Sequence, residues 1–393
     1  MAKVPFPKDG NDFLRRKKIV PTELWSDISG AEHAHAFTAS HIMESDMLES
    51  MLNILVEAQS EGKPFATIRK EFKQMMTMTG WYLNPDKIND EEYTNWRIGI
   101  IYDTNARTSY SAGRYRQQSR ISSLRPYLVY KQLQRPTKRE THEPLHNVCK
   151  PFADPFWDTY YPPNGWRCGC EARSLSKKQA ENGILNGSYH RNPGSSFSPD
   201  RDVPVEWRHN PGMEMIAPDF SKFTNLKNLV TKDGKNALYS VIKQYQNEIK
   251  DWKLSKKEWD KVVDLYAPTT GTTQKFQFFA GCLDSSIAEK IDIKETKMIY
   301  SSDKINHSVR DSKAINQKIS ISELKSLPEL NEKPDRIYFD KKNGYYLFIT
   351  QIDKDKVLKS SFAFAKNMSF SLRSIGKVQL IEVEKDIYNV RLY

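Results

Sequence analysis

Residues 139–177 read RETHEPLHNVCKPFADPFWDTYYPPNGWRCGCEARSLSK. The stretch contains five prolines, and a continuous helix is excluded because proline lacks the backbone N–H and clashes with the preceding turn. The sequence therefore predicts an ordered, loop-rich element packed by its aromatic side chains, which are Phe152, Phe156, Trp157, Tyr160, Tyr161 and Trp166.

Sulfur and imidazole groups gather in the same stretch. Cys168 and Cys170 are separated by one residue, and Cys149, His146 and His142 lie 19–26 residues before Cys168. Thiolate and imidazole ligands suit tetrahedral Zn²⁺, and a loop-rich element gains stability from such a site. Cys168, Cys170, His142 and Cys149 are therefore candidate zinc ligands, although Cys-x-Cys is tighter than the usual spacing. Two alternatives stay open: the cysteines pack as small apolar residues, or Cys149 forms a disulfide with Cys168 or Cys170.

Several motifs in this part of the chain resemble the phage Mu F-like head morphogenesis family of minor capsid proteins. The resemblance covers about residues 40–178. It departs from the family pattern at Asn147, where the family usually has glycine, and at Gly169, where it has arginine. The motifs are Arg139-x-x-His142, Asp154-PFW, Tyr161-PPNGWRCGC, Arg173-x-Leu175-Ser176, Tyr102-DTNARTSYSAGRY and Pro126-YLVYKQL.

The resemblance implies a phage or prophage minor head protein that acts in capsid morphogenesis near the portal. It also implies that the protein is made in the bacterial cytoplasm, resides in the virion, and has the portal or other capsid proteins as partners. Contact with packaged DNA is compatible with the net charge of +11, which 60 basic and 49 acidic residues produce. Solubility alone explains the same charge.

The composition of the 393 residues excludes other classes of protein. No run approaches the ~18 consecutive apolar residues that a membrane span requires. Residues 1–21 include basic residues but no apolar core, so Sec-dependent secretion is not expected. Four cysteines in a chain of this length do not form a disulfide scaffold, which favours a reducing compartment.

The kind of basic residue changes along the chain and indicates more than one module. Residues 1–210 contain 16 Arg and 13 Lys, whereas residues 211–393 contain 4 Arg and 27 Lys. Turn-forming residues are frequent at 190–214, which predicts a boundary there. We expect an α+β protein with a mainly helical module over 1–190, a linker and helical connector over 191–295, and a small domain with an antiparallel sheet over 296–393.

Periodicity predicts the individual elements. Apolar residues at helical spacing predict helices within 40–79, 90–120 and 221–266. The second of these regions has an arginine stripe that is either a phosphate-facing or a solvated surface, formed by Arg107, Arg114, Arg116 and Arg120. A short helix over 322–326 and β-rich runs are expected in the last module. The runs are Arg336-IYFD, Gly344-YYLFITQI, Ser361-FAFA, Lys377-VQLIEVE and Ile387-YNVRLY.

The order of features over 296–393 resembles phage-associated barnase–EndoU–RelE-like nuclease domains. The resemblance rests on Met298-IYSSDKINHSVRD-Ser312 and on the Leu-Pro bend and strands that follow. It implies metal-independent RNA cleavage, and hence an alternative function as a virion-delivered effector ribonuclease with RNA as substrate.

Such a reaction requires a proton-transfer group near neutral pKa and cations that stabilise the phosphorane. His307 is the candidate acid or base, and Lys304 and Arg310, three residues away on either side, are the candidate cations. A solvated helix face explains the same residues. The side chains considered for completing the site from the sheet are Tyr345, Tyr346, Ser360 and Lys366.

Overall fold

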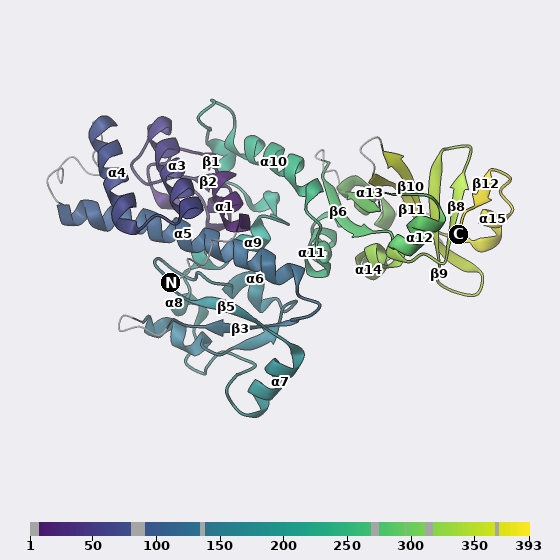
Figure 1. The fold of residues 1–393 in the computed structure, drawn as a ribbon, viewed down its shortest axis with the longest axis horizontal. Coiled ribbons are helices and arrows are strands. Elements are labelled where there is room, and N and C mark those ends of the chain that lie inside the picture. Colours follow the sequence, from purple (N-terminus) through teal and green to yellow (C-terminus); the bar gives the residue numbers. More distant parts are fainter. Residues whose placement is uncertain are drawn as a thin grey trace. The chain divides into compact units, whose positions relative to one another are not determined.

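A computed structural model describes residues 8–79, 91–133, 138–268, 275–294, 296–310, 317–365 and 369–393. Contacts divide the chain into two compact units, Met1–Gln244 and Tyr245–Tyr393. Helices dominate the first unit, and a seven-stranded, mostly antiparallel sheet dominates the second, which confirms the predicted α+β class (Figure 1). The division into modules 1–190, 191–295 and 296–393 stays a prediction. Among the described residues, no helix has the length and apolar character that crossing a membrane requires.

Three long helices form the core of the first unit and confirm the helices predicted there. They are α3 (Ser45–Glu61), α4 (Phe65–Thr79) and α5 (Glu91–Arg120). Gly62 ends α3 in the left-handed conformation, with φ 64°, which a residue without Cβ adopts at little cost. The buried side chains between the helices include Met47, Leu48, Met51, Leu52, Leu55, Ile68, Phe72, Ile98 and Ile101. Met47, Met51, Met75 and Met76 are thus part of the core, whereas Met78 is exposed.

Two polar contacts fix α5 against its neighbours. The buried amide of Gln59 in α3 donates to Ser109 Oγ over 2.7 Å. At the end of α5, Arg120 forms two hydrogen bonds of 2.7 Å with the carboxylate of Asp9 in α1 (Lys8–Arg15). Paired Arg–carboxylate bonds of this kind fix orientation as well as distance.

Short elements complete the first unit. β3 (Tyr127–Lys131) is the central strand of an antiparallel sheet, between β4 (Cys149–Pro151) and β5 (Glu171–Leu175). A parallel pair joins β1 (Lys18–Ile19) to β2 (Ala36–Phe37). The remaining helices are α2 (Gly30–His33), α6 (Phe156–Tyr160), α7 (Lys177–Leu185), α8 (Pro199–Asp202) and α9 (Pro211–Glu214).

The predicted helix over 221–266 is wrong in its first part. The chain forms two short 3₁₀ turns, Phe220–Lys222 and Leu226–Asn228, before α10 (Ala237–Glu248) begins. A turn separates them from α10, and Gly234 in that turn has φ 69°, which a helix does not permit. α11 (Lys256–Tyr266) confirms the last part of the prediction.

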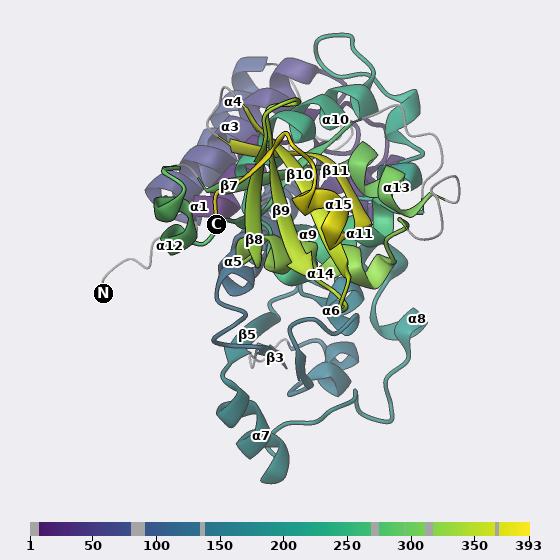
Figure 2. The same ribbon diagram turned by 90° about the vertical axis from the view of Figure 1, so that its right-hand side faces the viewer.

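The sheet of the second unit has the strand order β12-β8-β9-β10-β11-β7-β6. All neighbouring strands are antiparallel except β11 and β7, and Figure 2 shows β8, β9, β10 and β11 side by side. The strands are β6 (Gln277–Cys282), β7 (Lys297–Ser301), β8 (Arg336–Asp340), β9 (Tyr345–Gln351), β10 (Lys356–Ala365), β11 (Ser369–Gln379) and β12 (Asn389–Arg391). The helices are α12 (Ser285–Lys290), α13 (Ser302–Val309), α14 (Ile321–Glu332) and α15 (Leu380–Glu384).

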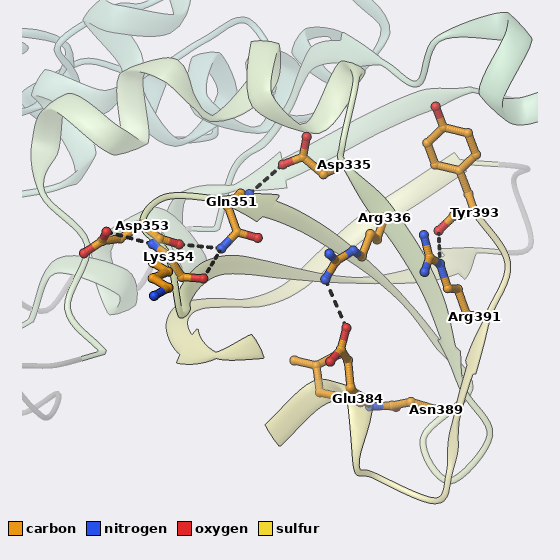
Figure 3. Close-up of polar contacts among 10 residues, drawn as sticks. Asp335, Arg336, Gln351, Asp353, Lys354, Glu384, Asn389, Arg391 and Tyr393 are labelled. Atoms are coloured by element: carbon orange, nitrogen blue, oxygen red, sulfur yellow. Dashed lines mark hydrogen bonds and ion pairs between the residues drawn. The ribbon is translucent and has the colours of Figure 1, made fainter. Parts of the chain in front are cut away.

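The run Lys377-VQLIEVE is a strand only in its first half. β11 ends at Gln379, and residues 380–384 form the short helix α15. Leu380 and Val383 are three residues apart, so the helix places both against the apolar cluster on the sheet. An ion pair of 3.1 Å between Glu384 and Arg336 also joins α15 to β8 (Figure 3).

α14 is longer than the predicted helix over 322–326 and contains Pro328. Proline cannot donate to the carbonyl four residues earlier, which here belongs to the buried Leu324. The indole N–H of Trp259 in α11 donates to that carbonyl over 3.0 Å. The carbonyl is thus satisfied, and the helix continues through the proline.

We expect Trp259→Phe to lower the free energy of unfolding by about 1–3 kcal/mol, because it leaves the buried Leu324 carbonyl without a donor. Urea denaturation of the full chain measures the change. Pro328→Ala supplies an N–H one turn further on, so the cost of Trp259→Phe should be smaller in that background. An equal cost in both backgrounds would contradict this account of α14.

Candidate metal centre

The segment 139–177 is held by buried aromatic side chains, as its sequence predicts. Trp157 and Tyr161 are fully buried, and Tyr161 donates to Gln118 Oε1 of α5 over 2.7 Å. The ring of Phe152 stacks on Tyr115 of the same helix, with centroids 5.3 Å apart. The irregular segment is therefore fixed against α5 by packing and by a buried hydrogen bond.

Two positions show why particular small residues occur in the segment. Asn147 has φ 65°, the left-handed conformation that glycine and asparagine adopt most readily, so asparagine fits this position. A Cβ on Gly165 would lie 2.3 Å from Nη1 of Arg139. The absence of a side chain at Gly165 lets Arg139 approach and donate to the carbonyl of Trp166 over 2.7 Å.

His142, Cys168 and Cys170 meet in the interior of this segment. His142 lies in the 3₁₀ helix Glu140–Leu145 and is fully buried, and the cysteines lie in the turn before β5. Nδ1 of His142 is 3.6 Å from the Sγ of Cys168 and 3.6 Å from the Sγ of Cys170. The possible ligand atoms of the three residues all lie within 4.8 Å of one another.

These distances fit a tetrahedral metal ion. Zn–S bonds of about 2.3 Å and Zn–N bonds of about 2.0–2.1 Å at a tetrahedral angle place sulfur and nitrogen about 3.6 Å apart. The buried group of His142, Cys168 and Cys170 can therefore hold a metal ion with little rearrangement. Within the described residues, no fourth His, Cys, Asp or Glu joins this group.

The electrostatics of the group separate the two thiols. Hydrogen bonding with Cys170 and His142 holds the pKa of Cys168 well below its usual value, although burial opposes the shift. Hydrogen bonding with the Cys168 thiolate, together with burial, raises the pKa of Cys170. Burial also raises the pKa of the neighbouring Tyr130, whose hydroxyl donates to Asn164 Oδ1 over 3.0 Å.

The structure does not bring Cys149, the fourth predicted ligand, to this group. Cys149 is paired with Val129 in the sheet and packs with it in an apolar cluster, whereas Tyr130 points to the opposite face, toward Cys168 and Cys170. Burial raises the pKa of the Cys149 thiol to about 11. None of the four cysteines forms a disulfide, and Cys149 lies on the other face of the sheet from Cys168 and Cys170, so the structure does not bring together the pair of the disulfide alternative.

A cavity of about 420 Å³ adjoins the cysteine turn and is lined by Arg107 and Arg114 of α5. The acidic side chains of its wall are engaged elsewhere: Asp103 pairs with Arg167 at 3.3 Å, and Glu171 pairs with Arg173. In the described parts of the chain, no carboxylate forms an ion pair with Arg107 or Arg114. The other two arginines of the predicted stripe do not share this setting, because Arg116 is buried and Arg120 pairs with Asp9.

The predicted catalytic residues of the second unit lie on and just after α13. His307 and Arg310 are exposed, and Lys304 is half-buried one turn before His307. Arg310 follows the end of the helix and donates to Asn306 Oδ1 over 2.8 Å. The catalytic role of these residues stays a prediction. Ser360 is buried, Tyr345 and Tyr346 are half-buried, and Lys366 lies outside the described residues.

Comparison with known proteins assigns the region that contains these motifs. Residues 49–173 match the family model described as Phage Mu protein F like protein. The chain therefore contains a Mu F-like region over these residues. No solved structure matches it.

Two relatives show how far the likeness extends. The chain is 24% identical over 383 residues to the candidate capsid assembly protein F of Escherichia phage Mu, an alignment that covers 88% of this chain and 84% of that protein. It is 30% identical over 159 residues to the Mu-like prophage FluMu F protein of Haemophilus influenzae, which covers 39% of this chain and 38% of that protein. The alignment with the phage Mu protein covers 88% of this chain, and the residues that it leaves out are far fewer than those of the second unit, Tyr245–Tyr393. Most of the second unit therefore has a counterpart in the phage protein.

Proposed function

We propose that this chain is a capsid assembly protein of a phage or prophage, made in the bacterial cytoplasm and incorporated into the virion near the portal. The observation that carries the proposal is the alignment with the phage Mu protein, whose name assigns it to capsid assembly. Because the alignment extends over most of both proteins, it supports a shared role for the whole chain. Portal and other head proteins are then the partners.

The second unit supports this role over that of a separate effector. A domain added to a head protein for a separate activity would not be expected in the phage Mu relative, whose name gives capsid assembly. Most of this unit is instead aligned with the phage Mu protein. The ribonuclease alternative, with His307 as its proton-transfer group, therefore rests on the order of sequence features over 296–393.

We also propose that the protein contacts packaged DNA through Arg107 and Arg114. The two residues are seven positions apart on α5, so they project from one side of the helix into the same cavity. Arginine side chains without carboxylate partners are available to phosphate oxygens, and each contact releases counterions from DNA.

Zn²⁺ is the metal ion that best fits the group of His142, Cys168 and Cys170. Two sulfur ligands and one imidazole at tetrahedral distances favour zinc over the oxygen-preferring cations. Bound zinc would neutralise both sulfurs and join the 3₁₀ helix to the cysteine turn. We assign it a structural role, because an irregular segment without long helices or strands gains most from such a link.

Purified, DNA-filled particles should contain this chain in few copies, as mass spectrometry of the particles can measure. Removing its gene should prevent the formation of filled heads, because the assembly step that it performs is lost. Complementation with the His307→Ala variant should restore filled heads, since assembly does not require that residue. Normal filled heads without the chain would contradict the proposed function, and RNA cleavage that His307→Ala abolishes would favour the effector alternative.

The Arg107→Gln/Arg114→Gln variant should bind double-stranded DNA more weakly, and equally so for different sequences. The slope of log affinity against log salt concentration should become shallower by about 2, because two phosphate contacts are lost. Arg120→Gln removes a positive charge from the same helix but from a residue paired with Asp9, so it serves as the control. Equal effects of the two variants would contradict a specific role for the cavity.

The purified chain should bind one Zn²⁺, and Cys168→Ser should abolish this binding, as elemental analysis after dialysis can test. Zinc should raise the melting temperature of the wild-type chain, because the folded state binds it preferentially. Cys149→Ala is the matched control, since Cys149 lies on the other face of the sheet. Zinc retained by Cys168→Ser, or lost equally in Cys149→Ala, would contradict the site.

A further inference from the structure

A second cavity in the first unit is walled by tryptophan side chains and has a volume of about 440 Å³. Trp166 forms edge contacts with Trp25 on one side and Trp207 on the other, both with centroids 5.3 Å apart. A Cβ on Gly30 would lie 1.8 Å from the carbonyl oxygen of Glu206, so α2 packs directly on the backbone next to Trp207. This tryptophan cavity, lined by Trp25, Trp166 and Trp207, lies within the size range of small-ligand sites.

A buried cation lies in the wall of the tryptophan cavity. Lys17 is 8% exposed, and its ammonium contacts Asn105 Oδ1 at 3.5 Å and the ring of Phe13 at 5.1 Å. Across the described ranges, no carboxylate forms an ion pair with Lys17. Burial lowers its pKa to about 7. A buried ammonium without an anion is unfavourable, and an anionic ligand in the cavity would remove that penalty.

Other polar groups of the wall favour an anion in the same way. The guanidinium of Arg97 lines the cavity and donates to the carbonyl of Ser40 over 3.0 Å. Trp207 Nε1 is buried and has no hydrogen-bond partner among the described residues. Burial lowers the pKa values of His33 and His209 to about 4, so both are neutral at pH 7. Glu206 is the acidic residue of the lining, and the described structure shows no ion pair between it and Lys17 or Arg97.

We propose that the tryptophan cavity binds a small organic anion: an aromatic or aliphatic group that carries a carboxylate. The tryptophan rings cover the apolar group, and Lys17 and Arg97 receive the carboxylate. Two sources have this chemistry, a free aromatic acid and the C-terminal residue of a partner polypeptide. The proposal is independent of the capsid assembly role and of the metal centre.

Isothermal titration of the full chain with three probes tests the proposal. N-acetyl-L-phenylalanine represents a chain terminus, phenylacetate represents a free acid, and N-acetyl-L-phenylalaninamide has the ring without the charge. We expect at least one acid to bind and the amide to bind roughly 10- to 100-fold more weakly, because a hydrogen bond to a charged group is lost. Preference for N-acetyl-L-phenylalanine over phenylacetate would identify a polypeptide terminus as the source, and the reverse a free acid.

The Lys17→Met variant should bind the preferred acid roughly 10- to 100-fold more weakly, because the ammonium that receives the carboxylate is lost. Without ligand it should have a higher melting temperature, because a buried unpaired charge is replaced by an apolar chain of similar length. Lys18→Met is the matched control, since the neighbouring Lys18 does not line the cavity. Equal affinity for acid and amide, no binding of any probe at millimolar concentration, or an unchanged affinity in Lys17→Met would overturn the proposal.

Discussion

The contact of the buried His142 imidazole with two cysteine sulfur atoms joins the two ends of residues 139–177. His142 and Cys168 are far apart in the sequence, and the residues between them form no long helix or strand. Their meeting therefore depends on side-chain contacts, namely the aromatic packing on α5, the hydrogen bond between Tyr130 and Asn164, and the close approach of Arg139 to Gly165. A bound metal ion would replace many weak constraints by one strong one.

α5 connects this segment to the cavity at the cysteine turn and to the tryptophan cavity. One side of the helix contributes Arg107 and Arg114 to the cavity at the cysteine turn, and another contributes Arg97 and Asn105 to the tryptophan cavity. Arg167 lies between Trp166 and Cys168 in the sequence and joins the segment to the helix through the carboxylate of Asp103 and the carbonyl of Trp96. α5 therefore forms part of the wall of both cavities, so a ligand in either one would contact this helix.

Local signals predicted much of the fold. Helical spacing within 40–79 predicted α3 and α4, and the β-rich runs Arg336-IYFD and Gly344-YYLFITQI predicted β8 and β9. The helix α15 was missed because two apolar residues three positions apart, Leu380 and Val383, do not predict a helix by themselves. The helix is favoured because it places both side chains against the apolar cluster of the sheet. A tertiary hydrogen bond from Trp259 likewise allowed α14 to pass through Pro328.

The sequence indicated three of the residues that meet in the candidate metal centre, and it missed the tryptophan cavity. Residue type and proximity identified His142, Cys168 and Cys170, whereas the exclusion of Cys149 depends on which face of a strand it occupies. The arginine spacing on α5 was the one signal that pointed to the neighbouring cavity. The residues of the tryptophan cavity are distributed from Lys17 to His209, so no local motif connects them.

The pairing of β7 with β11 has a consequence for how the second unit folds. It is the parallel pairing in this sheet, and its registered partners Met298 and Phe370 are 72 residues apart, about half the length of the unit. The edge of β7 that pairs with β11 therefore stays open until β11 has been synthesised. During translation this open strand edge can pair with wrong strands, so production of the chain is expected to be sensitive to chaperone supply.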